Sequence, residues 1–238
     1  MIGAEPAVDA LEAAYTKGHR LYELCGVGLT LGTGVWLIAR LIAGGSMPAW
    51  WYPLAIALGV LGADLVSGLV HWGFDTWGDL DTPVVGRLAI RAFRLHHLEP
   101  TAMLRHDFIE TNGHNITLAL TLTVGGLWMV PAADADATAR FVGLFLVTMA
   151  LFVSFTSQIH KWAHMPSPPR VVQALQLVGL LLSPEHHHAH HVAPHARNYC
   201  TTVGWLDPLF CATGFFPRLE RVIRFVSGAK PRRGDLHP

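Results

Sequence analysis

Histidine is the residue through which this sequence can do chemistry. Fifteen histidines occur among 238 residues, nearly as many as the 17 lysines and arginines together. Most of them lie in three tracts, residues 96–115, 160–164 and 186–195, and His71 follows a long apolar run. Imidazole is a ligand for zinc, copper, iron and nickel. The tracts therefore predict a metal-binding protein.

The spacing of these residues favours shared helix faces. Residues four apart on an α-helix project within about 40° of each other. Pairs with this spacing include His71 and Asp75, His106 and Glu110, His160 and His164, and His187 and His191. For the more isolated His19, His114 and His237 we favour helix capping or contact with lipid phosphate.

The number of ligands selects the kind of site. A structural zinc site closes with four ligands, and the HExxH motif of zinc proteases is absent. Ten imidazoles exceed the capacity of one metal, and the three cysteines form no CxxC pair. Two metals that share eight to ten nitrogen ligands suit iron. An iron pair can use O2 to remove hydrogen from an unactivated C–H bond while the protein orients the substrate.

The elements that must position these histidines are membrane helices. The chain is 51% hydrophobic and 14% charged, against about 25% charged for a soluble domain. Four spans are predicted, at residues 24–44, 50–72, 115–130 and 140–161, each near the roughly 20 residues that cross about 30 Å of hydrocarbon. The apolar run at 171–184 covers only about 21 Å, which favours an interfacial position.

Two features of the spans need interpretation. The first span contains Gly26, Gly28, Gly32 and Gly34, which we interpret as a helix-packing face rather than a nucleotide-binding loop. Asp64 is the ionisable residue that lies well inside a span. A transporter needs several such groups along its path, so this favours an enzyme over a metal transporter.

Basic residues orient the predicted bundle. Fifteen of the 17 lie on the side that holds both termini, the 73–114 loop and every histidine tract. The positive-inside rule places this side in the cytoplasm. Acidic and basic residues balance at 17 each, which excludes a basic nucleic-acid binder. We therefore expect an all-α integral membrane protein with about four transmembrane helices and a cytoplasmic helical cap that holds a histidine-rich two-metal site.

Five strings in the chain resemble, in order, the plasmanylethanolamine desaturase family, also called Kua or CarF-like lipid desaturases. They are HWGFDTWGD, HHLEPTAMLRHDFIETNG, QIHKWAH, HHHAHHVAPH and GWLDPLF, within residues 61–221. The resemblance implies a di-iron desaturase that converts the 1-O-alkyl ether of a plasmanyl phospholipid into the vinyl ether of a plasmalogen. His114 and His188 are not histidine in the animal pattern, which argues against them as ligands.

The predicted site follows from these motifs. We assign ten histidines to the metals: His71, His96, His97, His106, His160, His164, His187, His190, His191 and His195. His186 replaces His187 if the last helix is rotated. We assign Asp75, Glu110 and Asn115 to orienting the imidazoles, with Asp75 also matching the family's carboxylate.

The expected cofactors are two iron ions, with O2 as co-substrate. No flavin or nicotinamide motif is present, so we expect an external electron donor, cytochrome b5 or ferredoxin with a reductase. The other partner is an ether phospholipid in the bilayer. Five cations are candidates for binding its phosphate or the donor, with a solvated rim as the alternative: Arg91, Arg94, Arg105, Lys161 and Arg170.

Three further expectations complete the prediction. The chain divides into an amphipathic segment at 1–23, a membrane-embedded desaturase domain at 24–221 and a polar tail at 222–238. Fourteen arginines against three lysines suggest a GC-rich bacterial genome, and hence a bacterial inner membrane. The alternative activity is a phospholipid acyl-chain desaturase or hydroxylase with the same iron pair.

Overall fold

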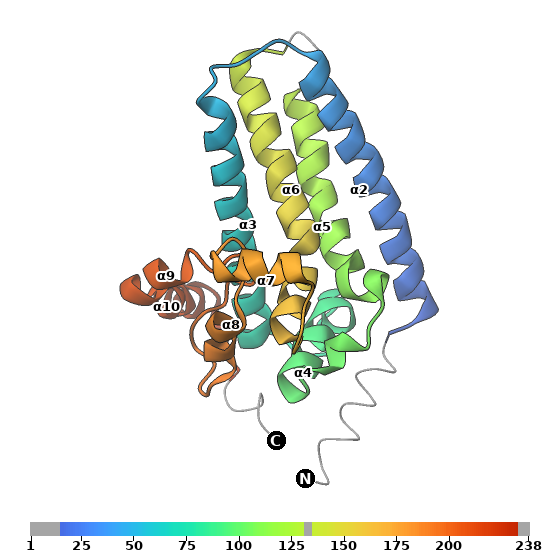
Figure 1. Ribbon diagram of the computed structural model, residues 1–238. Helices are drawn as coiled ribbons and strands as arrows, with labels where there is room; N and C mark the ends of the chain where they lie inside the picture. The colour runs from blue at the N-terminus through green and yellow to red at the C-terminus, as the bar shows by residue number, and fades with distance from the viewer. Residues whose placement is uncertain (1–14, 131–134, 233–238) are drawn as a thin grey trace.

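A computed structural model describes residues 15–130 and 135–232, and within these ranges every regular element is helical (Figure 1). Four long helices form a bundle: α2 (Lys17–Ala43), α3 (Trp51–Thr76), α5 (Phe108–Met129) and α6 (Ala137–His164). The shorter elements are a π-helical turn (Gly86–Ile90), α4 (Arg91–Leu98), a 3-10 turn (Ala102–Leu104), α7 (Arg170–Leu177), α8 (Pro184–His191), α9 (Asp207–Thr213) and α10 (Phe215–Ser227).

The bundle confirms the expected all-helical membrane architecture. α6 packs against both α3 and α5, and α2 packs against the other side of α5 (Figure 1). Among the described residues, α2, α3 and α6 are long and apolar enough to cross a membrane. α5 has 22 residues, about 33 Å at 1.5 Å per residue, but it begins with the polar string ETNGHN. The count of four spans therefore stays a prediction.

The long helices extend past the predicted spans toward the histidines. α3 continues to Thr76 and α6 to His164, so both carry metal-ligand candidates on their last turns. α5 begins at Phe108, where the Asp107 carboxylate accepts hydrogen bonds from the backbone N–H groups of Ile109 and Glu110. That is a regular N-cap, which satisfies backbone donors that the helix itself cannot. The helix α5 thus begins seven residues before the predicted span at 115–130.

The short helices gather at one end of the bundle, around the ends of α3 and α6 (Figure 1). α7 has eight residues and, as expected for this apolar run, does not cross the bundle. α2 begins within the predicted 1–23 segment, while residues 7–14 of that segment lie outside the described residues. α10 runs across the predicted boundary at 221.

The glycines of the first span lie in the continuous helix α2, which excludes the strand–loop–helix that a nucleotide site needs. Gly26 does act in packing, because a Cβ there would overlap Thr117 on α5. A Cβ at Gly28 or Gly32 would meet no other described part of the chain within 4 Å. The prediction of one glycine packing face is therefore wrong for those two residues.

Two contacts fasten the end of the chain to the bundle. Trp72 of α3 packs with Tyr199, Cys200, Phe210 and Phe216 in one buried cluster, in which burial of each phenylalanine contributes about 1.5–3 kcal/mol. Asp64 is fully buried, and its carboxylate accepts hydrogen bonds from the backbone N–H groups of Val203, Gly204 and Leu206 at 2.9–3.1 Å. The one acidic residue deep in a span therefore anchors a loop.

Candidate metal centre

Four helices that are distant in sequence bring their histidines together at the base of the bundle. α3 supplies His71 and Asp75 from its last turns, and α6 supplies His160 and His164 in the same way. α4 and α8 are short helices that contribute the remaining side chains: His96, His97, His187, His190 and His191. Within the described residues these side chains form two groups able to hold a metal ion.

The first, which we call the five-histidine group, contains His96, His160, His164, His187 and His191, with one ligand nitrogen of each within 4.8 Å of the others. Three pairs of Nε2 atoms are close: 2.7 Å for His160 and His187, and 2.9 Å both for His96 and His191 and for His187 and His191. His164 and His191 are half-buried, and the other three are buried. The Nε2 atoms thus converge on one point of the cap.

The second, which we call the Asp75 group, contains His71, Asp75, His97 and His190, all buried. The Asp75 carboxylate lies 3.3 Å from His71 Nε2, 3.1 Å from His97 Nε2 and 3.4 Å from His190 Nε2. The two groups are adjacent, because α4 and α8 each give neighbouring residues to both. The His96 and His97 ring centres are 5.7 Å apart, and those of His190 and His191 are 5.6 Å apart.

Backbone carbonyls set the orientation of two imidazoles in the Asp75 group. His71 Nδ1 donates to the carbonyl of Tyr199 at 3.0 Å, and His190 Nδ1 donates to that of Arg197 at 2.9 Å. A donor at Nδ1 leaves the lone pair on Nε2, the atom that faces the group. Sequence reasoning missed these partners because a carbonyl carries no residue-type signal.

The residues present fit a metal. Several buried ligand-type atoms have no hydrogen-bond partner, among them His71 Nε2, Asp75 Oδ2 and His164 Nε2, and an unsatisfied buried polar atom costs about 1–3 kcal/mol. Burial lowers the pKa of His191 to about 2, and it holds the pKa values of His96 and His187 well below their usual range. These imidazoles stay neutral, as metal ligands must be. Nitrogen donors with one carboxylate and no thiolate suit iron.

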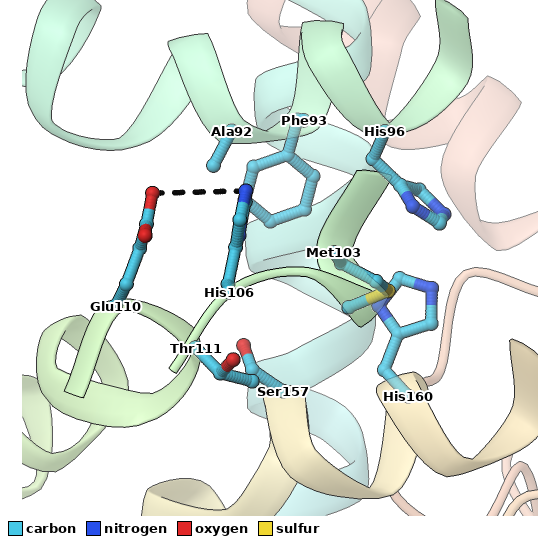
Figure 2. Close-up of a pocket in the computed structure, with 9 residues that line it drawn as sticks. All are labelled: Ala92, Phe93, His96, Met103, His106, Glu110, Thr111, Ser157 and His160. Atoms are coloured by element: carbon cyan, nitrogen blue, oxygen red, sulfur yellow. Dashed lines mark ion pairs between the residues drawn. The ribbon is translucent and has the colours of Figure 1, made fainter. Parts of the chain in front are cut away.

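Two predicted ligands lie outside both groups. His106 Nε2 is 3.6 Å from the Glu110 carboxylate, and Figure 2 shows this pair on one side of a cavity with His96 and His160 on the other. His195 Nδ1 donates to the carbonyl of His190 at 2.9 Å, at the end of α8.

The three residues predicted to orient imidazoles lie in different surroundings. Asp75 lies among the ligand atoms themselves, and Glu110 faces His106. Asn115 donates to Ser157 Oγ at 2.8 Å. Asp75 and Glu110 thus face imidazoles, whereas the contact described for Asn115 is with a serine hydroxyl.

The first three histidines of α8 lie in different surroundings. His187 is buried in the five-histidine group, whereas His186 Nε2 lies 2.7 Å from the Asp207 carboxylate. His188 is exposed. Asp207 had no predicted role, although it belongs to the GWLDPLF string, and it also accepts a hydrogen bond from the backbone N–H of Cys200. The observed rotation of α8 corresponds to the His187 alternative.

Most of the cations predicted to bind lipid phosphate or an electron donor have partners within the protein itself. Arg91 is buried with its guanidinium over the Tyr15 ring, and Arg105 pairs with Glu99 at 2.6 Å. Lys161 Nζ donates to the carbonyl of His106 at 2.6 Å. These side chains therefore help to shape the cap.

A membrane-helical fold with two adjacent histidine-rich metal groups defines a class of metal-dependent membrane enzymes, and comparison with known proteins identifies the family. The lipid desaturase domain matches residues 60–234. The chain is 39% identical to a plasmanylethanolamine desaturase of Myxococcus xanthus, over 96% of this chain and 80% of the relative. It is 41% identical to plasmanylethanolamine desaturase 1 of Mus musculus, over 95% of this chain and 85% of the relative.

A further relative, the chloroplastic fatty acid desaturase 4 of Arabidopsis thaliana, is 40% identical over 75% of this chain and 54% of its own length. No solved structure matches the chain. The chain belongs to the lipid desaturase family and is an oxidoreductase similar to plasmanylethanolamine desaturases. The family resemblance of the five strings is confirmed, as is the preference for an enzyme over a transporter.

Proposed function

We propose that this protein is a di-iron, O2-dependent desaturase that introduces the vinyl-ether double bond into the 1-O-alkyl chain of plasmanyl phospholipids. The observation that supports two metals is the adjacency of the five-histidine group and the Asp75 group, which share α4 and α8. We propose the vinyl-ether product because the relatives at 39% and 41% identity are plasmanylethanolamine desaturases.

Each group would hold one iron through the side chains described above. When bound, the iron pair supplies the activation of O2. The chain's residues would keep the ligand nitrogens neutral, aim Nε2 inward and exclude water from the Asp75 group. We propose His106 and His195 as supporting residues, in place of the ligand roles first assigned to them, because neither belongs to the two groups of converging ligand atoms.

The overall reaction needs electrons from outside the chain. One hydrogen leaves each of two neighbouring carbons of the alkyl chain, and a double bond forms between these carbons. O2 takes up the two hydrogens, two electrons and two protons, and two waters result. We propose cytochrome b5 or ferredoxin, with its reductase, as the source of the electrons.

The proposed depth of oxidation follows from where the groups lie. Both groups sit at the ends of α3 and α6, which are long enough to span a bilayer. The ligands would therefore lie close to the lipid head groups, on the side that the basic residues assign to the cytoplasm of a bacterial inner membrane. The first two carbons of the ether-linked chain lie at the same depth, whereas a mid-chain carbon lies deeper.

Two measurements on the full chain test the proposal. Untagged protein, purified without added metal, should contain two irons per chain, and a single tightly bound zinc would overturn the oxidative chemistry. Membranes from cells that express the chain should convert a plasmanyl phospholipid into its vinyl ether, detected as the aldehyde that acid releases from this linkage. Desaturation of the ester-linked acyl chain instead would favour the acyl-desaturase alternative, which the similarity to fatty acid desaturase 4 supports.

A further inference from the structure

Two cavities meet at the five-histidine group. The first, of about 90 Å³, lies between α4, the start of α5 and the end of α6, and His106 and Glu110 line its polar side (Figure 2). The second, of about 40 Å³, lies deeper in the bundle. Phe93, Ser157 and His160 line both cavities, so the two are adjacent. Both volumes are well below the roughly 300–1,000 Å³ of a typical ligand pocket, so each cavity holds only a short part of a ligand.

The deeper cavity is a groove between α3 and α5, with α6 as its floor. Val66 and Val70 from α3, Leu118 from α5 and Val153 from α6 give it apolar walls, between which lie the small polar side chains of Ser67, Thr156 and Thr201. Because α6 lies between α3 and α5 and packs against both, the two wall helices are held apart along this face (Figure 1). Leu118 is 40% exposed, so the groove opens sideways from the bundle. In a membrane, that opening faces the hydrocarbon.

The end of the groove nearest the histidines reaches both metal groups. His160, a member of the five-histidine group, lines it directly. Phe93 lines it as well, and its ring lies 5.3 Å from that of His71 in the Asp75 group. An alkyl chain that runs from the first cavity into the groove would pass His160 and Phe93. It would therefore pass beside both groups at one point along its length.

We propose that the groove between α3 and α5 binds the hydrocarbon chain that the enzyme desaturates. The chain enters the groove sideways from the bilayer, and the head group is held at the first cavity. This inference rests on the proposed function, since it names the binding site for that substrate. The polarity of the path matches an amphiphile, from the His106–Glu110 pair to the valines of the groove. Asn115 and Ser157, joined at 2.8 Å, lie at the junction and act as positioning residues.

The open side of the groove has a consequence for selectivity. A closed pocket would measure the chain from its methyl end, because the pocket floor stops it. Here the chain can leave past Leu118 into the bilayer, so the position of reaction is counted from the head group. Alkyl chains of different length should therefore be oxidised at the same two carbons.

Photolabelling tests the site without relying on turnover. The probe is a 1-O-alkyl glycerophosphoethanolamine with a diazirine halfway along the alkyl chain, added to the full metal-loaded protein in vesicles. Peptides from residues 63–70 of α3, 115–122 of α5 and 150–157 of α6 should carry most of the label, and unlabelled lipid should compete. Label spread evenly over the lipid-facing sides of all four long helices would overturn the proposal.

Two matched tryptophan variants sharpen the test. Leu118→Trp fills the groove and should lower the groove labelling and the turnover at least about tenfold. Val124→Trp lies on the same helix at similar exposure, 49%, outside the groove, and should leave both unchanged. Equal behaviour of the two variants would overturn the groove. If Leu118→Trp lowers the protein yield, Leu118→Ala, which removes the wall without adding volume, should keep the label in the groove but spread it along α5.

Failure of the groove and failure of the proposed function give different results. A vinyl ether formed with label outside the groove would refute the groove alone. Label in the groove without a vinyl ether would refute the proposed product and leave the chain-binding site standing.

Discussion

The two metal groups differ in how open they are. The Asp75 group is buried throughout, and two of its imidazoles are fixed by backbone carbonyls. The five-histidine group includes half-buried His164 and His191, and a cavity of about 620 Å³ reaches these two and His187. One group is closed and carries a carboxylate, whereas the other is open and neutral. The comparison suggests that the Asp75 group fixes its metal and that the five-histidine group meets small molecules from outside.

The largest effect should come from removing the charge in the closed group. Asp75→Asn keeps the shape of the side chain but takes away the carboxylate that three imidazoles face. We expect iron to fall from two to one per chain and desaturation to fall at least about 100-fold. Metal analysis and product formation measure this. Asp81→Asn, at an exposed loop residue, is the matched control, and full iron in Asp75→Asn would contradict a ligand role for the carboxylate.

A second test uses the openness of the five-histidine group. His164→Gly should lower turnover by about 10- to 100-fold, and added imidazole should restore part of it because the 620 Å³ cavity reaches this residue. His71→Gly should not be rescued, since His71 is 1% exposed. His188→Ala, at an exposed histidine of the same tract, is the control. Rescue of both variants, or of neither, would remove the distinction between open and closed groups.

The protonation of the imidazoles predicts a pH dependence for the metal-free protein. The pKa values of His96, His187 and His191 are lowered in the folded state by burial, whereas in the unfolded chain they titrate near 6.5. Below about pH 6.5 the unfolded state binds more protons, so the free energy of unfolding should fall as pH falls, by up to about 1.4 kcal/mol per pH unit for each histidine.

Unfolding of metal-free protein in detergent, measured between pH 5 and 8 with denaturant, checks this expectation. Iron-loaded protein is the comparison, and its loss of stability should begin at lower pH because protons must displace the metal. A metal-free protein with the same stability at pH 5 and pH 8 would show that these imidazoles are not buried as neutral groups.

The smallest effect should come from the loop that fixes the closed group. Asp64→Asn removes the charge that accepts three backbone N–H donors next to Tyr199 and Cys200. We expect about 1–3 kcal/mol less stability and about a tenfold loss of turnover, with two irons still bound. Thermal unfolding, metal analysis and product formation separate these effects. Loss of turnover without loss of stability would contradict an anchoring role.

Local periodicity determined much of the site in advance. Because i and i+4 residues share a helix face, the pairs His160 with His164 and His187 with His191 could be read from the sequence, and each pair does enter one group. His71 and Asp75 likewise enter one group. That the protein is an all-helical membrane protein followed from composition. Long uncharged runs favour the bilayer, where the backbone must satisfy its own hydrogen bonds, as it does in a helix.

Tertiary structure decided what the spacing left open. His96 and His97 are neighbours in sequence yet belong to different groups, because successive side chains on a helix diverge by about 100°: His96 joins the α6 histidines, and His97 joins His71 and Asp75 of α3. His106 has the same spacing to Glu110 as the other three pairs, but it precedes α5, which begins at Phe108, and it lies outside both groups. The carbonyls of Tyr199 and Arg197 were invisible, since any residue type supplies one. The sequence by itself determined which side chains share a face, and only the packing of the helices determined which faces meet.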